Sequence, residues 1–419
     1  MNYLQDWIFK MKRDIHEIVK EELSHKLGIN SFSIPNFFGQ PINIGQPALT
    51  DIRRKSRLIT EFLAIVSHIA YESVHCNSQT IINILFSESP VGMTVAYHKA
   101  LPSCCWEIPM IFRTDESISG KIYEIQAPGS GWGDLSLYAK GYKELGYEIP
   151  DWILDFPSKY ENCFIDNIDN KSPRIFHMLD AASVPHSMRY LMAITGNLRY
   201  WGLDKDVNMH DIDYVVSHSV VSIVTSNYFK DYLSLAREGK LKFAIQPNLI
   251  FDEKAIYLLP FYRETYKCFS DEIRNIFPFT SIIENDGFYN EEGVFENIGD
   301  FCKRKPGDRK YYLKYGGPDI SRNWGSRSVY RLSGNDCEML LNMANELAKK
   351  GEIWLLQKEV SKELAPNASD EIVNLFENQK MYLKLSSFYG KGELMGIKVM
   401  GRKHFKVHGQ KDTYVGLGI

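Results

Sequence analysis

The stretch Tyr311-Tyr-Leu-Lys314-Tyr-Gly316-Gly317 opens the part of the chain that decides the fold. Its apolar pattern is typical of a strand that ends in a lysine, and a loop containing Gly325 and Ser326 follows. The pattern then predicts a strand over 328–332, a helix over 335–349 and a strand over 353–360. The last of these strands turns polar at its end, in Gln357-Lys358-Glu359-Val360.

This order of elements suits a nucleotide. Backbone N–H groups of the Gly325–Ser326 loop can close over phosphates, and Lys314 can supply a point charge. The polar end of the last strand, residues 357–360, can present backbone groups to an adenine edge. Neither G-x-x-x-x-G-K-[ST] nor G-x-G-x-x-G occurs in the chain. Taken one at a time, the same pieces are better explained by a long hairpin turn and a solvated edge strand, and only their order and spacing favour a nucleotide.

A second stretch, about 190 residues earlier, carries carboxylates. Strands are expected over 106–112 and 121–126, with a turn over 114–120 between them. Oxygen atoms of Asp115, Glu124 and Gln126 would converge there, and oxygen is the ligand that Mg²⁺ prefers. Arg113 would neutralise a phosphate or a substrate carboxylate. The alternative is a surface hairpin whose charges face water.

The run from Lys314 to Val360 resembles the nucleotide-binding run of the ATP-grasp fold. Because the acidic hairpin precedes this run, the chain resembles the circularly permuted ATP-grasp ligases, and specifically the synthetase domain of glutathionylspermidine synthase. That family has an Arg-x-Asp strand followed by a Glu-x-Asn strand, which Arg113, Asp115 and Glu124 match, with Gln126 in place of the asparagine. The resemblance implies ATP and Mg²⁺ as cofactors, with Asp115, Glu124 and Gln126 as metal ligands.

The resemblance also implies roles for other residues. Lys267, ten residues before Phe277-Pro278, stands where the family has an earlier phosphate-binding lysine, and Lys254 is the alternative. An arginine near the end of family members helps to stabilise the transferring phosphoryl group. Arg402 is assigned that place, and Lys398 is the alternative to it. Arg113 of the hairpin is the second residue to which a catalytic role is assigned. ATP would lie against Lys267, Lys314, Gly325, Ser326, Gln357, Lys358, Glu359 and Val360.

The implied function is that of a carboxylate–amine ligase. ATP would phosphorylate a carboxylate, an amine would attack the acyl phosphate, and ADP, phosphate and an amide would result. The partners would be a small-molecule or peptide carboxylate and an amine acceptor. Two alternatives stay open: a carrier protein whose thiol accepts the acyl group, and a non-catalytic descendant that still binds nucleotide.

Composition bounds these hypotheses. The 419 residues carry 49 Lys and Arg against 52 Asp and Glu, so no basic field points to nucleic acid or to a membrane surface. The seven cysteines are scattered without a CxxC pair. No signal peptide or membrane-spanning run is legible, and a cytoplasmic location is expected.

The expected class is α+β (mixed α/β), as a circularly permuted ATP-grasp fold with an N-terminal helical segment. Helical spacing predicts helices over 2–27, 51–74 and 229–237, whereas 190–195, 215–225, 243–251 and 255–261 have strand-like patterns. The expected organisation is a mostly helical region over 1–100, a central α/β region with the metal hairpin and acyl-substrate site over 101–260, and the nucleotide-binding region over 261–419.

Overall fold

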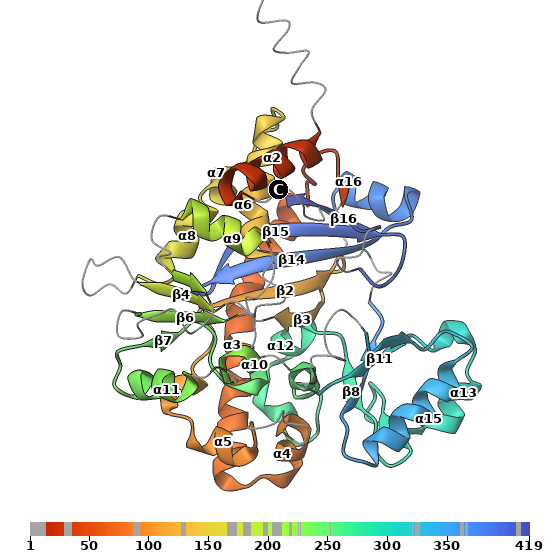
Figure 1. Cartoon of the computed structure of the whole chain (residues 1–419). Helices are drawn as coiled ribbons and strands as arrows, with labels where there is room; N and C mark the ends of the chain where they lie inside the picture. Colours follow the sequence, from red (N-terminus) through yellow and green to blue (C-terminus); the bar gives the residue numbers. More distant parts are fainter. Residues whose placement is uncertain are drawn as a thin grey trace, which may run out of the picture.

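The computed structural model confirms the α+β class (Figure 1). It describes residues 14–28, 36–86, 93–126, 131–165, 174–178, 186–195, 200–202, 212–217, 220–224, 226, 228–251, 253–317, 319, 322, 327–360, 364, 368–407 and 412–419. Gly325 and Ser326 lie outside these residues. Among the described helices, none is long and apolar enough to cross a membrane.

The largest sheet has six strands in the order β1-β16-β15-β14-β2-β3. Its strands are antiparallel except for the parallel pair β1 and β16. The two hairpin strands at one edge come from the first third of the chain and their neighbour β14 from its end. The bounds are β1 Asn36–Phe37, β2 Ile111–Ser117, β3 Ile122–Gln126, β14 Tyr382–Gly390, β15 Glu393–Arg402 and β16 Tyr414–Gly418.

Helices cover both faces of this sheet (Figure 1). The long helix α3, Gln46–Cys76, packs on one face, where the hydroxyl of Tyr389 donates to the carbonyl of Ile52 at 3.2 Å. On the other face, Trp132 and Leu135 of α6 pack against Phe388. The other helices near this sheet are α2 Ile15–Leu27, α7 Asp151–Leu154 and α8 Phe156–Asn162, and α6 spans Trp132–Glu144. Helices α4 Gln79–Phe86 and α5 Val95–Ala100 pack beside α3, away from the sheet (Figure 1).

A second, antiparallel sheet has four strands in the order β12-β11-β13-β8. Alternate side chains of β11 and β13, such as Leu313 and Leu356, form a core with α13 and α15. The predicted strand over 311–315 is β11, and the predicted helix over 335–349 is α15. The bounds are β8 Thr280–Ile282, β11 Tyr311–Tyr315, β12 Val329–Arg331, β13 Trp354–Lys358, α13 Ile298–Lys303 and α15 Cys337–Ala348, with a separate hairpin of β9 Gly287–Tyr289 and β10 Phe295–Asn297.

A third sheet is parallel, in the order β5-β4-β6-β7. Helix α11 matches the predicted helix over 229–237. The bounds are β4 Ile175–Met178, β5 Tyr200–Gly202, β6 Tyr214–Ser217, β7 Lys242–Phe243, α9 His186–Ile194, α10 Val220–Val224, α11 Phe229–Arg237, α12 Asp271–Ile276 and α16 Asp370–Val373.

Several strand predictions in the middle of the chain are wrong. Residues 190–195 lie in helix α9, where Tyr190 and Leu191 are buried. Residues 255–261 begin in a 3₁₀ helix, η5 (Lys254–Leu258), whose residues are all buried. Residues 215–225 divide into β6 and α10, and only the start of 243–251 is strand. Short apolar runs that are buried on every side have no periodicity that separates strand from helix.

The structure contains the predicted hairpin of two antiparallel strands, but its first strand begins and ends later in the sequence than expected. Trp106 belongs to a 3₁₀ helix, η1 (Ser103–Trp106), and the first strand begins only at Ile111. Thr114 to Ser117, expected in the turn, are strand residues and all are buried. Polar residues are tolerated there because β14 and α3 supply partners. Lys384 and Ser386 of β14 bind Asp115, and Lys55 of α3 has its Nζ 3.3 Å from the Glu116 carboxylate.

Candidate functional site

The β2–β3 hairpin places four polar side chains on one face of the six-stranded sheet. Arg113 stands opposite Gln126, and Asp115 stands opposite Glu124. Directly opposed residues of antiparallel strands point to the same side of a sheet. The guanidinium of Arg113 donates to the amide oxygen of Gln126. The structure therefore brings together the four hairpin residues that the sequence singled out.

Asp115 is the centre of a buried network. Lys384 of β14 lies with its Nζ 2.7 Å from Asp115 Oδ2, and the hydroxyl of Ser386 donates to Oδ1 at 2.7 Å. Arg113 Nε is 3.3 Å from Oδ1. Burial opposes the charge, but Arg113 and Lys384 outweigh it and hold the pKa of Asp115 well below its usual range. Asp115 is therefore a buried anion that two cations share.

Lys384 and Ser386 were missed at the sequence level. Their signal is the run Tyr382-Leu-Lys384-Leu-Ser386, in which polar and apolar residues alternate with the period of a strand. Such a pattern usually places polar residues in water. Here the polar side faces the interior, and only the register Ser386 opposite Asp115 reveals it.

A third cation stands beside this network on β15. Lys398 Nζ lies 2.7 Å from the carboxylate of Asp134, in the first turn of α6. Burial lowers the pKa of Lys398; Asp134 raises it, while Arg113 and Lys384 lower it further. The backbone at Gly131, before α6, approaches Lys398 so closely that a β-carbon there would stand 2.7 Å from its Nζ. Arg113, Lys384 and Lys398 are thus near enough to repel one another.

Glu124 joins the hairpin to the second sheet. Lys254 of η5 has its Nζ 3.7 Å from Glu124 Oε1. Burial lowers the pKa of Lys314, on β11, to about 8; Glu124 raises it and Lys254 lowers it. Lys314 Nζ donates to the amide oxygen of Gln357 at 2.5 Å and lies 5.5 Å from the ring centre of Tyr123. The two sheets therefore meet at Glu124, Lys254 and Lys314.

These groups form one set, which we call the junction cluster. It contains five basic side chains and three carboxylates, so its formal charge is two units positive when all are ionised. Its members are Arg113, Asp115, Glu124, Asp134, Lys254, Lys314, Lys384 and Lys398. A buried excess of positive charge destabilises the folded protein when nothing is bound, and it favours the binding of an anion.

The residues expected to hold adenine lie at the end of β13. Gln357 is buried, and its Nε2 donates to the Thr280 hydroxyl at 3.3 Å. Lys358 points to the other side, 2.8 Å from Glu291. Glu359 accepts from Nε and Nη2 of Arg331 at 3.1 and 2.5 Å, and Val360 is buried. Gln357 is thus the residue of this group that contacts the junction cluster.

Two pairs of alternative residues are separated by position. Lys254 is buried within the junction cluster, whereas Lys267 is exposed on a 3₁₀ turn, η6 (Tyr266–Cys268). Lys398 lies beside Arg113, whereas Arg402, at the end of β15, binds Asp412 and the carbonyl of Lys406. In both pairs the structure places the alternative residue, and not the first choice, in the cluster.

The oxygen donors suit Mg²⁺ unequally. Asp115 already accepts from Lys384 and Ser386, while the Glu124 side chain is 27% exposed. Within the described part of the chain, no three His, Cys, Asp or Glu side chains come together as a metal site. Mg²⁺ usually takes one or two protein carboxylates and completes its shell with phosphates and water. The hairpin fits such a metal through Glu124, because the Gln126 oxygen, like Asp115, already accepts from a cation, the Arg113 guanidinium.

The fold and the site together define an α+β protein with a cationic junction between the six-stranded sheet and the sheet of β8 and β11–β13. Neither the family models nor the curated protein sequences match this chain. Among solved structures, it is similar to a glutathione synthetase-like effector from Globodera pallida in the apo form, with a TM-score of 0.50 and 11% identity. That similarity covers 97% of this chain and 98% of the effector, so the two share an overall fold.

Proposed function

We propose that the protein is an ATP-dependent carboxylate–amine ligase of the permuted ATP-grasp type, forming ADP, phosphate and an amide. The observation that carries this proposal is the junction cluster, where buried cations outnumber carboxylates by two between two sheets. A magnesium–nucleotide complex carries the negative charge that would balance them. The synthetase-like name of the structural neighbour agrees with this class of reaction.

The position of each residue in the cluster indicates its role in binding the nucleotide. Lys314 and Lys254 would neutralise the nucleotide phosphates, and Gln357 would hold Lys314 in place through their hydrogen bond. The backbone groups of residues 357–360, at the end of β13, would contact the edge of the adenine base. Positioning and charge neutralisation dominate phosphoryl transfer, so no protein nucleophile is needed.

Glu124 and the phosphates would hold Mg²⁺, which supplies further neutralisation of phosphate charge when bound. Asp115 would act mainly by positioning Arg113 and Lys384. These two cations, with Lys398, would face the carboxylate that accepts the phosphoryl group. The hairpin register, Asp115 opposite Glu124, keeps the two roles next to each other.

A second candidate is a nucleotide-binding protein that does not catalyse ligation. It is favoured by one observation: Asp115 is already neutralised by Arg113 and Lys384, so a full two-carboxylate metal site would need Lys384 to move. Such a protein would bind Mg²⁺–ATP and form no acyl phosphate.

Trapping with hydroxylamine separates the two candidates without knowledge of the amine. The purified protein is incubated with Mg²⁺–ATP, hydroxylamine and a panel of amino acids, peptides and other carboxylates. A ligase transfers the γ-phosphoryl group to the carboxylate, and hydroxylamine displaces phosphate to give a hydroxamate. We expect hydroxamate and ADP in equal amounts with at least one carboxylate, and none with Lys314→Met. ATP binding without hydroxamate across the panel would favour the non-catalytic candidate.

A further inference from the structure

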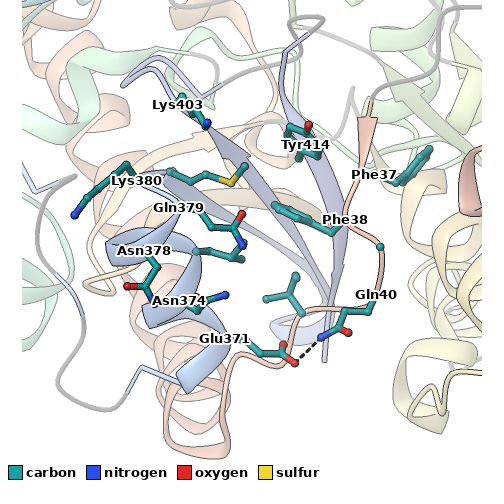
Figure 2. Close-up of a pocket in the computed structure, with 14 residues that line it drawn as sticks. Phe37, Phe38, Gln40, Glu371, Asn374, Asn378, Gln379, Lys380, Lys403 and Tyr414 are labelled. Carbon is teal, nitrogen blue, oxygen red and sulfur yellow. Dashed lines mark hydrogen bonds between the residues drawn. The ribbon is translucent and has the colours of Figure 1, made fainter.

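A cavity of about 720 Å³ lies at the opposite edge of the six-stranded sheet from the hairpin (Figure 2). Its walls come from β1, from the segment after it, from α16 and the turn that follows, and from the ends of β14–β16. Small-molecule sites typically have volumes of roughly 300–1,000 Å³. None of the junction cluster residues lines it.

The lining combines an apolar floor with convergent polar groups. Phe38, Ile42, Leu375 and Met381 are buried and apolar. Figure 2 shows Asn374, Asn378 and Gln379 on one wall and the rings of Phe38 and Tyr414 on the other. Two of the amides pair with each other, since Asn378 Nδ2 donates to Asn374 Oδ1 at 2.9 Å. A side-chain amide offers both donors and an acceptor, as a peptide bond does. The walls therefore match a ligand that has an apolar group beside an amide.

Charge is distributed along the cavity. Lys380 and Lys403 stand toward one end, with the Lys380 side chain extending away from Lys403 (Figure 2). Glu371 stands at the other end, where Gln40 Nε2 donates to it at 2.9 Å and the backbone N–H of Asn43 at 2.6 Å. The lining therefore carries two lysines toward one end and one carboxylate, held by neutral donors, at the other.

The backbone around the cavity is unusual in two places. Asn374–Asn378 form a π-helical turn, η9, a rare element that is frequent at functional sites. Lys380 has φ = 55°, in the left-handed region that lysine seldom adopts. Both features place lining side chains, and a sequence under no such constraint would use an α-helical turn and a glycine.

We propose that this cavity binds the C-terminal residue of a short peptide, with an apolar side chain on the floor and the carboxylate at Lys380 and Lys403. The Gln379 amide and the Asn374 Nδ2 group would pair with the peptide bond. This site is separate from the proposed nucleotide site and does not depend on it.

Methionine NMR tests the proposal at the cavity itself, because Met381 lines it. Protein labelled with ¹³C at the methionine methyl groups is titrated with the tripeptide Gly-Gly-Leu and with its C-terminal amide, and Met381→Leu assigns the signal. We expect a saturable shift of Met381 with the acid and at least about tenfold weaker binding of the amide. Substitution of both lysines (Lys380→Gln with Lys403→Gln) should weaken binding of the acid by a similar factor.

A blocking variant and its matched control complete the test. Gly39 lines the cavity, and a β-carbon there would meet nothing within 4 Å, so Gly39→Phe fills the space without strain at its own position. Gly307→Leu, at an equally open position on η7 (Pro306–Asp308), is the control. Binding should be lost in the first and kept in the second. No saturable Met381 shift in the wild type, or equal affinity for acid and amide, would overturn the proposal.

Discussion

The junction cluster has two halves, one around Asp115 and one around Glu124, and the two carboxylates have different surroundings. Asp115 is 1% exposed and lies within 3.3 Å of basic nitrogens of both Arg113 and Lys384. Glu124, directly opposite in the hairpin, is 27% exposed and lies 3.7 Å from Lys254. A buried, fully hydrogen-bonded carboxylate holds its neighbours in place, whereas a looser and wetter one can exchange partners. From this comparison we expect the half around Asp115 to position its neighbours and the half around Glu124 to bind ligand.

The largest expected effect is on stability and comes from Asp115. In Asp115→Asn, the buried Arg113 and Lys384 lose their shared anion, and the free energy of unfolding should fall by about 3–5 kcal/mol. Urea denaturation followed by circular dichroism measures it. Asp300→Asn, which breaks an exposed pair with Lys303, is the control and should leave the midpoint unchanged. Equal midpoints for the two variants would contradict a positioning role for Asp115.

Lys314→Met should give the next largest effect, on binding. A charged hydrogen bond to phosphate contributes about 1.5–3 kcal/mol, so ATP affinity should fall roughly 10- to 100-fold by calorimetry. Stability should not fall with it, because burial already disfavours the charged form of Lys314. A variant that binds ATP as tightly as the wild type would remove Lys314 from the site.

The pH dependence follows from the pKa of Lys314, about 8. Only the protonated form attracts phosphate, so affinity should be constant below pH 8. Above that value it should fall by up to about tenfold per pH unit. In the unliganded protein, burial of charged Lys314 disfavours folding at neutral pH. Because the unfolded chain binds more protons between pH 8 and 10.5, this destabilisation diminishes as pH rises. Calorimetry from pH 7.5 to 9.5 measures the affinities. Lys314→Arg, which stays charged, should flatten the profile; a flat wild-type profile would contradict the assignment.

The smallest effect separates two lysines. Lys254→Gln should weaken ATP binding by about five- to tenfold, because its charge lies at Glu124 within the cluster. Lys267→Gln should change it less than twofold, since Lys267 is exposed on η6. The reverse order, measured in one buffer, would restore Lys267 as the phosphate lysine.

How far the sequence predicts this structure depends on periodicity. Strand 311–315 and helix 229–237 were predictable because their patterns have one clear period and a definite end. Residues 190–195 were not, because a buried helix and a buried strand present the same short apolar run. The division of the chain at residues 100 and 260 does not separate sheets, since the six-stranded sheet takes β1, the hairpin and β14–β16 from all three parts.

The site was predictable only where its residues are close in sequence. Arg113, Asp115, Glu124 and Gln126 share one hairpin, so strand alternation alone places them on one face. Lys384 is 269 residues from Asp115, and its role depends on a strand register that no local pattern encodes. That Lys254 lies at Glu124 while Lys267 is exposed likewise depends on how η5 packs against the hairpin.

Calorimetry of ATP with and without Mg²⁺, on the wild type and on Glu124→Gln, tests the central claim most directly. Glu346→Gln, on the exposed side of α15, is the control. We predict binding in the micromolar range that Mg²⁺ strengthens in the wild type and in the control. In Glu124→Gln, Mg²⁺ should strengthen binding little or not at all. No ATP binding by the wild type, or an equal Mg²⁺ effect in Glu124→Gln, would contradict a nucleotide site at the junction of the two sheets.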